Sequence, residues 1–516
     1  MCGWPDLNEQ QYRAVCETCD RILLAPDSTI ERVAIPWLHV IREHPVVLAN
    51  YIDLFEPVKG FKAIGHKWWR VFRRMIYWLR QIGRFLRSRG KPWFGPEYLP
   101  SAIDVLFVSH LVSASHVGQA EDFYFGGLPN EIVCDGHTAV IALINQSGQP
   151  AVHFADKWKG CAVQRVVLSG SLHLLEEVTL RHRLKKESLR LAKLAKKADP
   201  GLLRCVLARA SEEALSDAST TTLRMATQIS ALAARLQPKA IIVIHEGHAW
   251  ERVVFAAARS VHPNVRCIGY QHAAIFRLQH AIRRNLAREY NPDQILTAGT
   301  VGKGQLERAP GLNVIQISVL GSNRISKRDS VICQRPLHQG QAKPSDNSKC
   351  LVLPEGIPSE CHLLFEFSLD CAQAYPEIQF IWRLHPLMTH ESLATKNPRL
   401  RKLPKNIELS QATLEEDIVR CRYALYRGTT AIVQAVVAGL RPIYLQLPNE
   451  MTIDPLYELR DWRVNVSTIS EFRSVFNSDN DSSLCISKSE AQTAIKYCEN
   501  IFLPFDHKAL LESLGN

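Results

Sequence analysis

Two apolar segments between Phe380 and Leu445 constrain the fold most strongly, because each combines a strand pattern with a polar ending. The first reads FIWRLHP. Alternate residues of a strand face opposite sides, so Arg383 and His385 share one face at its carboxyl end. Pro386 cannot donate to a sheet ladder and therefore ends the strand. The segment predicts a buried strand that presents an arginine and a histidine together.

The second segment reads LYRGTTAIVQAVVAGLRPIYL and predicts a strand that runs directly into a helix. Arg427 and Gly428 form the turn. Thr429 or Thr430 supplies a capping hydroxyl, and Gly439 closes the helix. A helix N-terminus with exposed N–H groups favours an anion. With the arginine and histidine of the first segment, this pattern suits a phosphate that is bound and protonated as it leaves. The alternative is an ordinary capped helix beside a core histidine.

An HP dipeptide followed by an RG(S/T)T helix start resembles the HP and S motifs of bacterial glycosyltransferases that use CMP-activated sugars. Sialyltransferases, polysialyltransferases and capsule-type Kdo transferases belong to this group. The resemblance implies a GT-B fold, in which both motifs lie in the C-terminal domain and clasp the phosphate and ribose of the donor. Thr429 and Thr430 stand where a serine is common, so the hydroxyl is kept.

Length and composition predict an ordinary globular chain of more than one domain, because 516 residues exceed one usual domain and 46% of them are hydrophobic. The start, MCGWPDLNEQ, lacks a signal-peptide pattern, and no apolar run approaches the ~18–20 residues of a spanning helix. The 14 cysteines show no disulfide-like spacing, so we expect a cytoplasmic chain. Cys16 and Cys19 form a CxxC without a second pair, and we expect no metal site.

The net charge of +11 has one main source, residues 57–96, which contain 11 lysines and arginines and no acidic residue. Trp68, Phe72, Ile76 and Leu79 recur at helical spacing there, with arginines around them. A basic, tryptophan-rich amphipathic helix is typical of one lying on an anionic membrane surface. The alternatives are a helix packed on the protein's own surface and an RNA-binding patch. No nucleic-acid module accompanies it, so we expect no nucleic-acid partner.

An α/β pattern begins near residue 102, and polar residues follow its predicted strands. AIDVLFVSHLV predicts a buried strand, and the loop after it carries Gln119 and Asp122. AIIVI predicts another strand, followed by the turn HEGH, a helix, and a parallel strand that ends in Gln271 and His272. Open α/β sheets bind ligands at the carboxyl ends of their strands. We therefore expect Glu246, in the HEGH turn, to lie at a crevice edge, although a single carboxylate there is often only a helix cap.

The HEGH segment is similar to the same glycosyltransferase group, in which an acidic residue followed by glycine acts as base toward the acceptor hydroxyl. This resemblance implies that role for Glu246. Asp122 is the second choice for the base, and we expect His248 on the acceptor side. The YQHA segment is similar to the YQHG element of surface-polysaccharide enzymes. Ala273 stands where glycine is usual, so the segment departs from that element at the turn after His272.

The expected architecture is α/β with two Rossmann-like domains of GT-B type and a basic N-terminal helical region. Its divisions are a helical region at 1–100, an acceptor domain at 101–325, a linker at 326–349, a donor domain at 350–500 and a tail at 501–516. Glu355 and Gly356 follow the first strand of the donor domain and should face the cleft.

The expected function is transfer of a Kdo- or sialic-acid-type sugar from a CMP donor to a capsule polysaccharide or lipopolysaccharide acceptor. The acceptor would be a growing lipid-linked glycan at the inner face of the cytoplasmic membrane, with the enzyme bound peripherally. No cofactor or metal is required if protein groups neutralise the phosphate, and no DxD element lies near these motifs. The alternatives are a GT-B transferase using a CDP-polyol or UDP-sugar, and a non-catalytic membrane-associated glycan assembly protein.

Each candidate residue has an expected role, and the pattern leaves inversion and retention of configuration both open. The catalytic candidates are Glu246, His385 and Asp122; those for donor binding are Arg383, Pro386, Glu355, Gly356, Arg427, Gly428, Thr429 and Thr430; those on the acceptor side are Gln119, His248, Gln271 and His272.

Overall fold

The computed structural model describes residues 7–55, 90–324, 349–385, 388–478 and 488–514, together with residues 72, 76 and 83. The chain forms two compact units. Unit 1 contains residues 1–272, 279–323 and 504–516, and unit 2 contains residues 273–278 and 324–503. Most of the predicted basic helix, the predicted linker up to residue 348, and Pro386 lie outside the described residues. The membrane-surface helix therefore stays a prediction.

Unit 1 is built on a sheet with the strand order β1-β4-β3-β2-β5-β6-β7-β8, in which only β1 is antiparallel to its neighbour. Its inner strands read VLFVSHL, AVIALIN and AIIVI and are almost wholly buried, as expected for a parallel sheet covered on both faces. The strands are β1 (Trp93–Phe94), β2 (Val105–Leu111), β3 (Ala139–Asn145), β4 (Gln164–Leu168), β5 (Ala240–Ile244), β6 (Arg266–Gln271), β7 (Gln294–Thr297) and β8 (Gln316–Val319).

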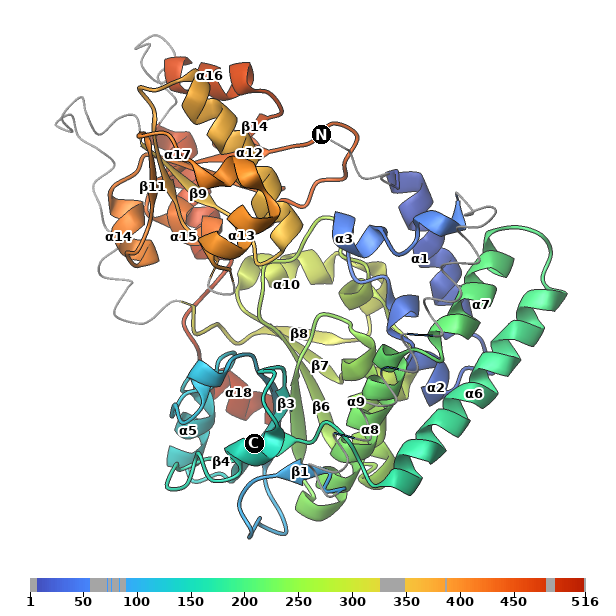
Figure 1. The fold of residues 1–516 in the computed structure, drawn as a ribbon. Helices are drawn as coiled ribbons and strands as arrows, with labels where there is room; N and C mark the ends of the chain where they lie inside the picture. The colour runs from blue at the N-terminus through green and yellow to red at the C-terminus, as the bar shows by residue number, and fades with distance from the viewer. Residues whose placement is uncertain are drawn as a thin grey trace. The chain divides into compact units, whose positions relative to one another are not determined.

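Helices cover both faces of this sheet. On one face, α8 and α9 bury Ile229, Leu232 and Phe255 against the strands, and on the other α5 and α18 bury Leu128 and Leu510. Figure 1 shows α6 running alongside α7, and the C-terminal α18 next to α5. The helices are α1 (Glu9–Leu23), α2 (Ile30–Val33), α3 (Pro45–Leu48), α5 (Leu128–Cys134), α6 (Leu174–Lys197), α7 (Leu202–Glu213), α8 (Asp217–Leu236), α9 (Ala249–Val261), α10 (Thr300–Glu307) and α18 (His507–Leu514).

Charged side chains attach the N-terminal segment to the rest of unit 1. The buried guanidinium of Arg32 lies 2.6 Å from the carboxylate of Glu187 on α6. Asp20 on α1 contacts both His280 and Arg284 at 2.8 Å. Because these partners are far apart in sequence, residues 7–55 are an integral part of this unit.

Unit 2 is built on a fully parallel sheet with the strand order β11-β10-β9-β12-β13-β14. Its core includes Phe365 and Trp382, whose rings stack with centroids 4.4 Å apart. The elements are β9 (Lys349–Leu353), α12 (Pro358–Ala374), β10 (Gln379–Trp382), α13 (His390–Lys396), β11 (Ile407–Leu409), α14 (Leu414–Val419), β12 (Tyr423–Tyr426), α15 (Ala431–Val437), β13 (Arg441–Leu445), β14 (Val464–Val466), α16 (Ile469–Ser478) and α17 (Lys488–Glu499).

Both sheets have the doubly wound order of a Rossmann fold. Numbered from the first parallel strand of each unit, the order begins 3-2-1-4-5-6 in both cases. The predicted α/β class with two Rossmann-like sheets is confirmed. The order reverses between β2 and β5 in unit 1 and between β9 and β12 in unit 2, and ligands bind at such switch points. Within the described ranges, no helix combines the length and the apolar character that crossing a bilayer requires.

Candidate functional site

The turn after β5 is fixed by the buried carboxylate of Glu251, which lies in the first turn of α9. Its Oε2 accepts hydrogen bonds from three successive backbone N–H groups, those of Glu246, Gly247 and His248, at 2.9, 2.7 and 3.1 Å. The Nδ1 of His245 lies 2.9 Å from the same oxygen. A carboxylate in this position satisfies N–H groups that have no partner within the helix. Glu251 therefore determines where the Glu246 side chain projects.

Only glycine fits at position 247 of this turn. Its φ of +90° lies in the region that side chains disfavour. A Cβ there would also come within 2.3 Å of the carbonyl carbon of Ala281. Glycine is therefore required after Glu246, because the backbone of Ala281 comes very close to the backbone of residue 247.

Two histidines flank the carboxylate of Glu246 at the switch point of unit 1. His248 Nε2 lies 3.5 Å from Glu246 Oε2, and His272 Nε2 lies 4.0 Å from Oε1. The Glu246 side chain is 29% exposed, so a ligand can reach it. The ring of Tyr124, from the loop after β2, packs edge-on against His272 at 4.5 Å. Gln271, predicted beside His272, is buried at the end of β6.

The charges of this group favour an ionised Glu246 beside a protonated histidine. Burial raises the pKa of Glu246, but the hydrogen bond from His248 and the positive charges of His272 and Arg42 outweigh it, and the pKa lies below its usual value. Burial lowers the pKa of His248, but the hydrogen bond to Glu246 and the charge of Glu251 raise it above 6.5. Glu246 and His248 therefore titrate as a coupled pair.

We call Glu246 and His248 the Glu246–His248 pair. Several aromatic rings lie near it. His110 packs edge-on against Trp250 at 5.1 Å, and Phe123 against Tyr124 at 4.8 Å. The Phe123 ring stacks on His116 at 4.7 Å and is 46% exposed. Phe123 and Tyr124 were not predicted as site residues, although the aromatic run FYF in the loop after β2 was a signal for them.

Asp122 and Gln119, predicted from the same loop, have other partners. Asp122 is buried, and its Oδ1 accepts hydrogen bonds from the Ser109 hydroxyl at 2.8 Å and from the N–H groups of Tyr124 and Phe125 at 2.9 Å. Burial raises the pKa of this carboxyl, and these hydrogen bonds offset part of that rise. The Gln119 amide donates to a backbone carbonyl of its own loop at 3.1 Å. These contacts shape the loop that carries Tyr124.

A second polar group lies at the switch point of unit 2, and we call it the Glu355 cluster. It consists of Glu355 and Gly356 after β9, His385 after β10, and Gly428 after β12. A Cβ on Gly356 would lie 2.8 Å from His385 Cε1, and a Cβ on Gly428 would lie 2.7 Å from Glu355 Oε1. The two glycines thus allow the carboxylate and the imidazole to approach the backbone closely. Residues that lie far apart in the sequence meet here.

The imidazole of His385 is half-buried, and its charge state depends on what is bound. Burial lowers its pKa below the usual value, and the negative charge of Glu355 offsets part of this effect. An anionic ligand beside the ring would raise the pKa of His385, as the charge of Glu355 does. The lowered pKa favours a neutral His385 imidazole, and an adjacent negative charge favours its protonated form.

The two arginines of the motifs are bound to carboxylates within unit 2. The guanidinium of Arg427 is buried and lies 2.6 Å from both Glu360 and Glu450. Arg383 donates to Asp417 at 3.0 Å and to a backbone carbonyl of the loop before α14. The sequence predicted that Arg383 projects together with His385, but the structure pairs it with Asp417. For Arg427, the contacts indicate a structural ion-pair network rather than an exposed phosphate ligand.

The hydroxyls at the start of α15 are arranged differently from a simple cap. Thr430 occupies the N-cap position without a side-chain capping bond, and its Oγ1 instead accepts from Arg324 at 2.7 Å. Thr429 Oγ1 accepts from the N–H of Ala431 at 3.4 Å. Arg324 was missed by the sequence analysis, because it precedes the predicted linker and belongs to no motif. It places a guanidinium at the beginning of the RGTT helix.

Comparisons by sequence give no family. No protein-family model matches the chain, and a search of curated proteins found no match.

Solved structures show distant likenesses. A glycotransferase of kitacinnamycin is similar with a TM-score of 0.46 and 11% identity, over 81% of this chain and 100% of that one. The UDP-GlcNAc 2-epimerase from Neisseria meningitidis, bound to UDP-GlcNAc, has a TM-score of 0.42 and 12% identity over 80% and 99%. The trehalose 6-phosphate synthase from Burkholderia multivorans has a TM-score of 0.44 and 11% identity over 80% and 96%. With these scores, the assignment of two Rossmann-like sheets rests on the strand orders themselves.

Proposed function

We propose that this chain is a glycosyltransferase that uses a nucleotide-activated sugar, with the donor bound by unit 2 and the acceptor by unit 1. The observation that carries the proposal is the presence of a polar cluster at the switch point of each Rossmann-like sheet. One cluster offers a carboxylate with a flanking histidine, and the other a histidine and two glycines beside a helix start. Glycosyl transfer needs a base for the acceptor hydroxyl and a site for the leaving phosphate.

In unit 1, the Glu246–His248 pair is proposed to remove the proton of the acceptor hydroxyl. A base must be able to accept a proton, so the competent state has Glu246 ionised and His248 neutral. The exposed ring of Phe123, with Tyr124 and Trp250, offers apolar faces on which a sugar ring can pack. We assign His272 to the acceptor side as well, because it contacts both Glu246 and Tyr124.

In unit 2, the Glu355 cluster is proposed to bind the nucleotide part of the donor. His385 would donate a proton to the phosphate as the glycosidic bond breaks, and Arg324 with the Thr430 hydroxyl would contact the phosphate oxygens. Gly356 and Gly428 leave room for a ligand to approach the backbone. Glu355 would accept hydrogen bonds from ribose hydroxyls or from the base.

The proposed donor is a CMP-activated sugar of Kdo or sialic acid type. The support is the HP and RGTT resemblance, because His385 and Gly428 of these motifs lie next to Gly356 and Glu355. The proposed acceptor is a lipid-linked capsule polysaccharide or lipopolysaccharide, which would be consistent with a basic helix at the inner membrane face. A CDP-polyol or UDP-sugar donor remains the alternative on the same fold.

A thermal-shift titration with CMP, CDP, UDP and GDP tests the donor. At a nucleotide concentration of about 100 times Kd, binding stabilises the native state by about 2.7 kcal/mol, so we expect CMP to raise Tm by about 5 °C. His385→Ala should abolish the shift. His390→Ala, which removes an imidazole from nearby α13, should retain it.

Other outcomes of this titration separate the alternatives. A shift with UDP or CDP but not with CMP would replace the CMP-sugar donor by the alternative. If no nucleotide shifts Tm, the non-catalytic assembly protein becomes the better explanation. An equal loss of the shift in the His385 and His390 variants would remove the Glu355 cluster from the donor site.

Binding to anionic membranes is the expected property of residues 57–96. Each arginine near an anionic surface contributes about 1 kcal/mol, so removing several should abolish sedimentation with vesicles rich in phosphatidylglycerol. The test variant replaces six arginines by glutamine and spares β1: Arg70, Arg73, Arg74, Arg80, Arg84 and Arg87.

The control variant removes positive charge from exposed positions of α6, and it should still sediment. Its substitutions to glutamine are at Lys185, Lys186, Lys193, Lys196 and Lys197. Vesicles of phosphatidylcholine alone should bind neither protein. Sedimentation of the six-arginine variant at the wild-type level would contradict the membrane assignment.

A further inference from the structure

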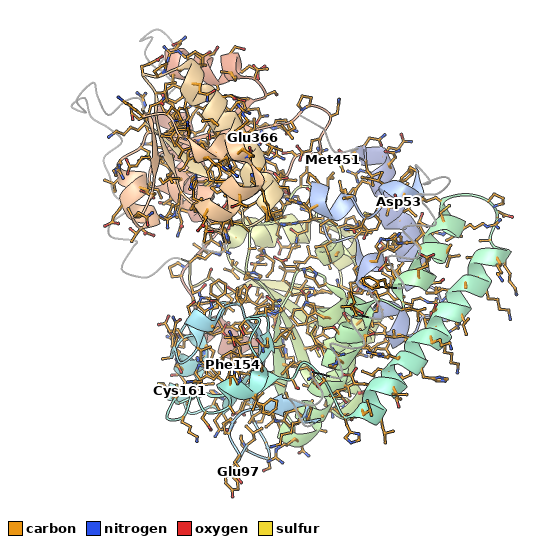
Figure 2. All side chains as sticks on the ribbon, in the orientation of Figure 1. Asp53, Glu97, Phe154, Cys161, Glu366 and Met451 are labelled. Carbon is orange, nitrogen blue, oxygen red and sulfur yellow. The ribbon has the colours of Figure 1, made fainter. Side chains whose placement is uncertain are left out.

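A cavity lies within unit 1, and neither Glu246 nor His248 lines it. It has a volume of about 620 Å³ and is lined by the carboxyl ends of β3 and β4, by β1 and by the first turns of α8. Its rim includes the exposed residues Gly148 and Gln149. Figure 2 labels Phe154, in the short helix Ala151–Phe154 whose first two residues also line the cavity. The volume is in the range of small-molecule sites.

Buried polar side chains present free hydrogen-bonding atoms to this cavity. The Gln228 amide nitrogen donates to the carbonyls of Pro92 at 2.6 Å and Ser169 at 2.9 Å, which fixes the amide and leaves its Oε1 available. The Thr222 hydroxyl has no hydrogen-bond partner within the described part of the chain, although the residue is 4% exposed. The Ser169 hydroxyl accepts one long bond, at 3.4 Å, and can still donate. None of these atoms is a buried polar atom without a partner, so they are accessible from the cavity, and a ligand in it can bond to them.

The charges around the cavity disfavour an anionic ligand, because the carboxylate of Asp217 also lines it. The guanidinium of Arg224 lines it but is bound to Glu177 at 2.5 and 3.0 Å, so its charge is matched. Apolar side chains complete the walls, among them Phe94 and Met225. Neutral hydroxyl and amide groups combined with apolar faces are suited to a sugar ring, which has hydroxyls at its edge and C–H groups on its faces.

We propose that this cavity binds an uncharged sugar unit of the glycan acceptor, away from the reacting end. The cavity and the Glu246–His248 pair both lie at the carboxyl edge of one sheet, where β3 and β4 neighbour β2. A glycan bound in both places would be oriented by a unit that takes no part in the chemistry. Only the identification of this sugar as part of the acceptor rests on the proposed function.

Isothermal titration of the full chain without nucleotide tests the cavity, with N,N′-diacetylchitobiose, maltotriose and 3′-sialyllactose as probes. We expect at least one neutral saccharide to bind at millimolar concentration and the charged one to bind more weakly. Thr222→Val removes the free hydroxyl with little change of volume and should weaken binding about 5-fold. Met225→Trp adds bulk to one wall of the cavity and should also weaken binding.

Thr227→Val is the matched control, because Thr227 lies on α8, bonds to a backbone carbonyl and does not line the cavity. It should bind like the wild type. Equal affinities of the Thr222 and Thr227 variants, or no binding of either neutral saccharide to the wild type, would overturn the proposal. If the chain binds a saccharide but no nucleotide, the cavity site is supported and the transferase proposal is rejected. The two proposals can therefore fail independently.

Discussion

Replacing Glu246 by glutamine is expected to lower the rate of glycosyl transfer by about 10²–10⁴-fold, the range for loss of a general base, while leaving donor affinity unchanged. Glutamine has the same shape but cannot take the proton of the acceptor hydroxyl. The turn itself should persist, because Glu251 binds the backbone N–H groups of this turn and not the Glu246 side chain. The measurement is single-turnover transfer with the nucleotide sugar that the thermal shifts select.

The control for this variant is Glu121→Gln, which removes an exposed carboxylate from the loop after β2 and should keep the wild-type rate. A Glu246→Gln protein with the wild-type rate and unchanged Tm would reject Glu246 as the base. Asp122, the second choice from sequence, would then be tested next, although its buried hydrogen bonds predict that its substitution lowers stability as well.

The pH dependence of this reaction gives an independent test of the pair. The pKa of Glu246 is lowered, so Glu246 is ionised at every pH above about 5. The pKa of His248 is raised above 6.5, and the competent state requires His248 to be neutral. The rate should therefore rise with pH through a value above 6.5. In His248→Gln this limb should move to acidic pH, toward the pKa of Glu246 alone, and an unchanged profile would contradict the coupling.

Replacing Arg427 by methionine is expected to destabilise unit 2 by about 3–5 kcal/mol, because it leaves two buried carboxylates without their partner. Glu360 and Glu450 each lie 2.6 Å from the guanidinium, and all three side chains are nearly inaccessible to solvent. Chemical denaturation followed by the fluorescence of the unit 2 tryptophans measures the loss. Nucleotide binding should weaken only as far as the fraction of folded protein falls.

Two further variants separate a structural role of Arg427 from phosphate binding. Arg399→Met breaks an ion pair with Asp370 in which both side chains are well exposed, and it should cost at most about 1 kcal/mol. Adding Glu360→Gln and Glu450→Gln to Arg427→Met removes the unpaired charges and should recover part of the stability. If Arg427→Met keeps the wild-type stability but loses nucleotide binding, the guanidinium contacts the donor.

The fold could be predicted from local patterns, and so could the residues of each candidate site that lie at strand ends. Continuous apolar runs such as AIIVI identify buried parallel strands, and the carboxyl ends of such strands meet at one edge. This is why Glu246 and His272, and also Glu355 and His385, lie together although the sequence separates them. The EG turn could be identified because only glycine fits at position 247, where the backbone of Ala281 approaches.

The remainder depends on long-range partners that no local pattern shows. Strand alternation described the backbone before His385, yet Arg383 turns to Asp417 on α14, which lies 34 residues later. Arg427 pairs with carboxylates on α12 and after β13, and these could not be identified from the RGTT motif. The cavity beside Thr222 forms where β1, β3, β4 and α8 meet, so it has no sequence signal. The sequence therefore located the turns at the strand ends, but not the long-range ion pairs of their arginines.

The C-terminal helix α18 has a consequence for the order in which this protein matures. Its residues are translated after all of unit 2, yet Leu510 is buried in the core of unit 1, and Ser513 contacts Gln294 on β7 at 3.1 Å. Unit 2 is thus an insertion in the chain of unit 1. On the ribosome, unit 2 can complete its sheet while unit 1 still lacks its last helix. A truncation or frameshift after residue 503 would therefore impair the folding of unit 1, although most of unit 1 is synthesised before unit 2.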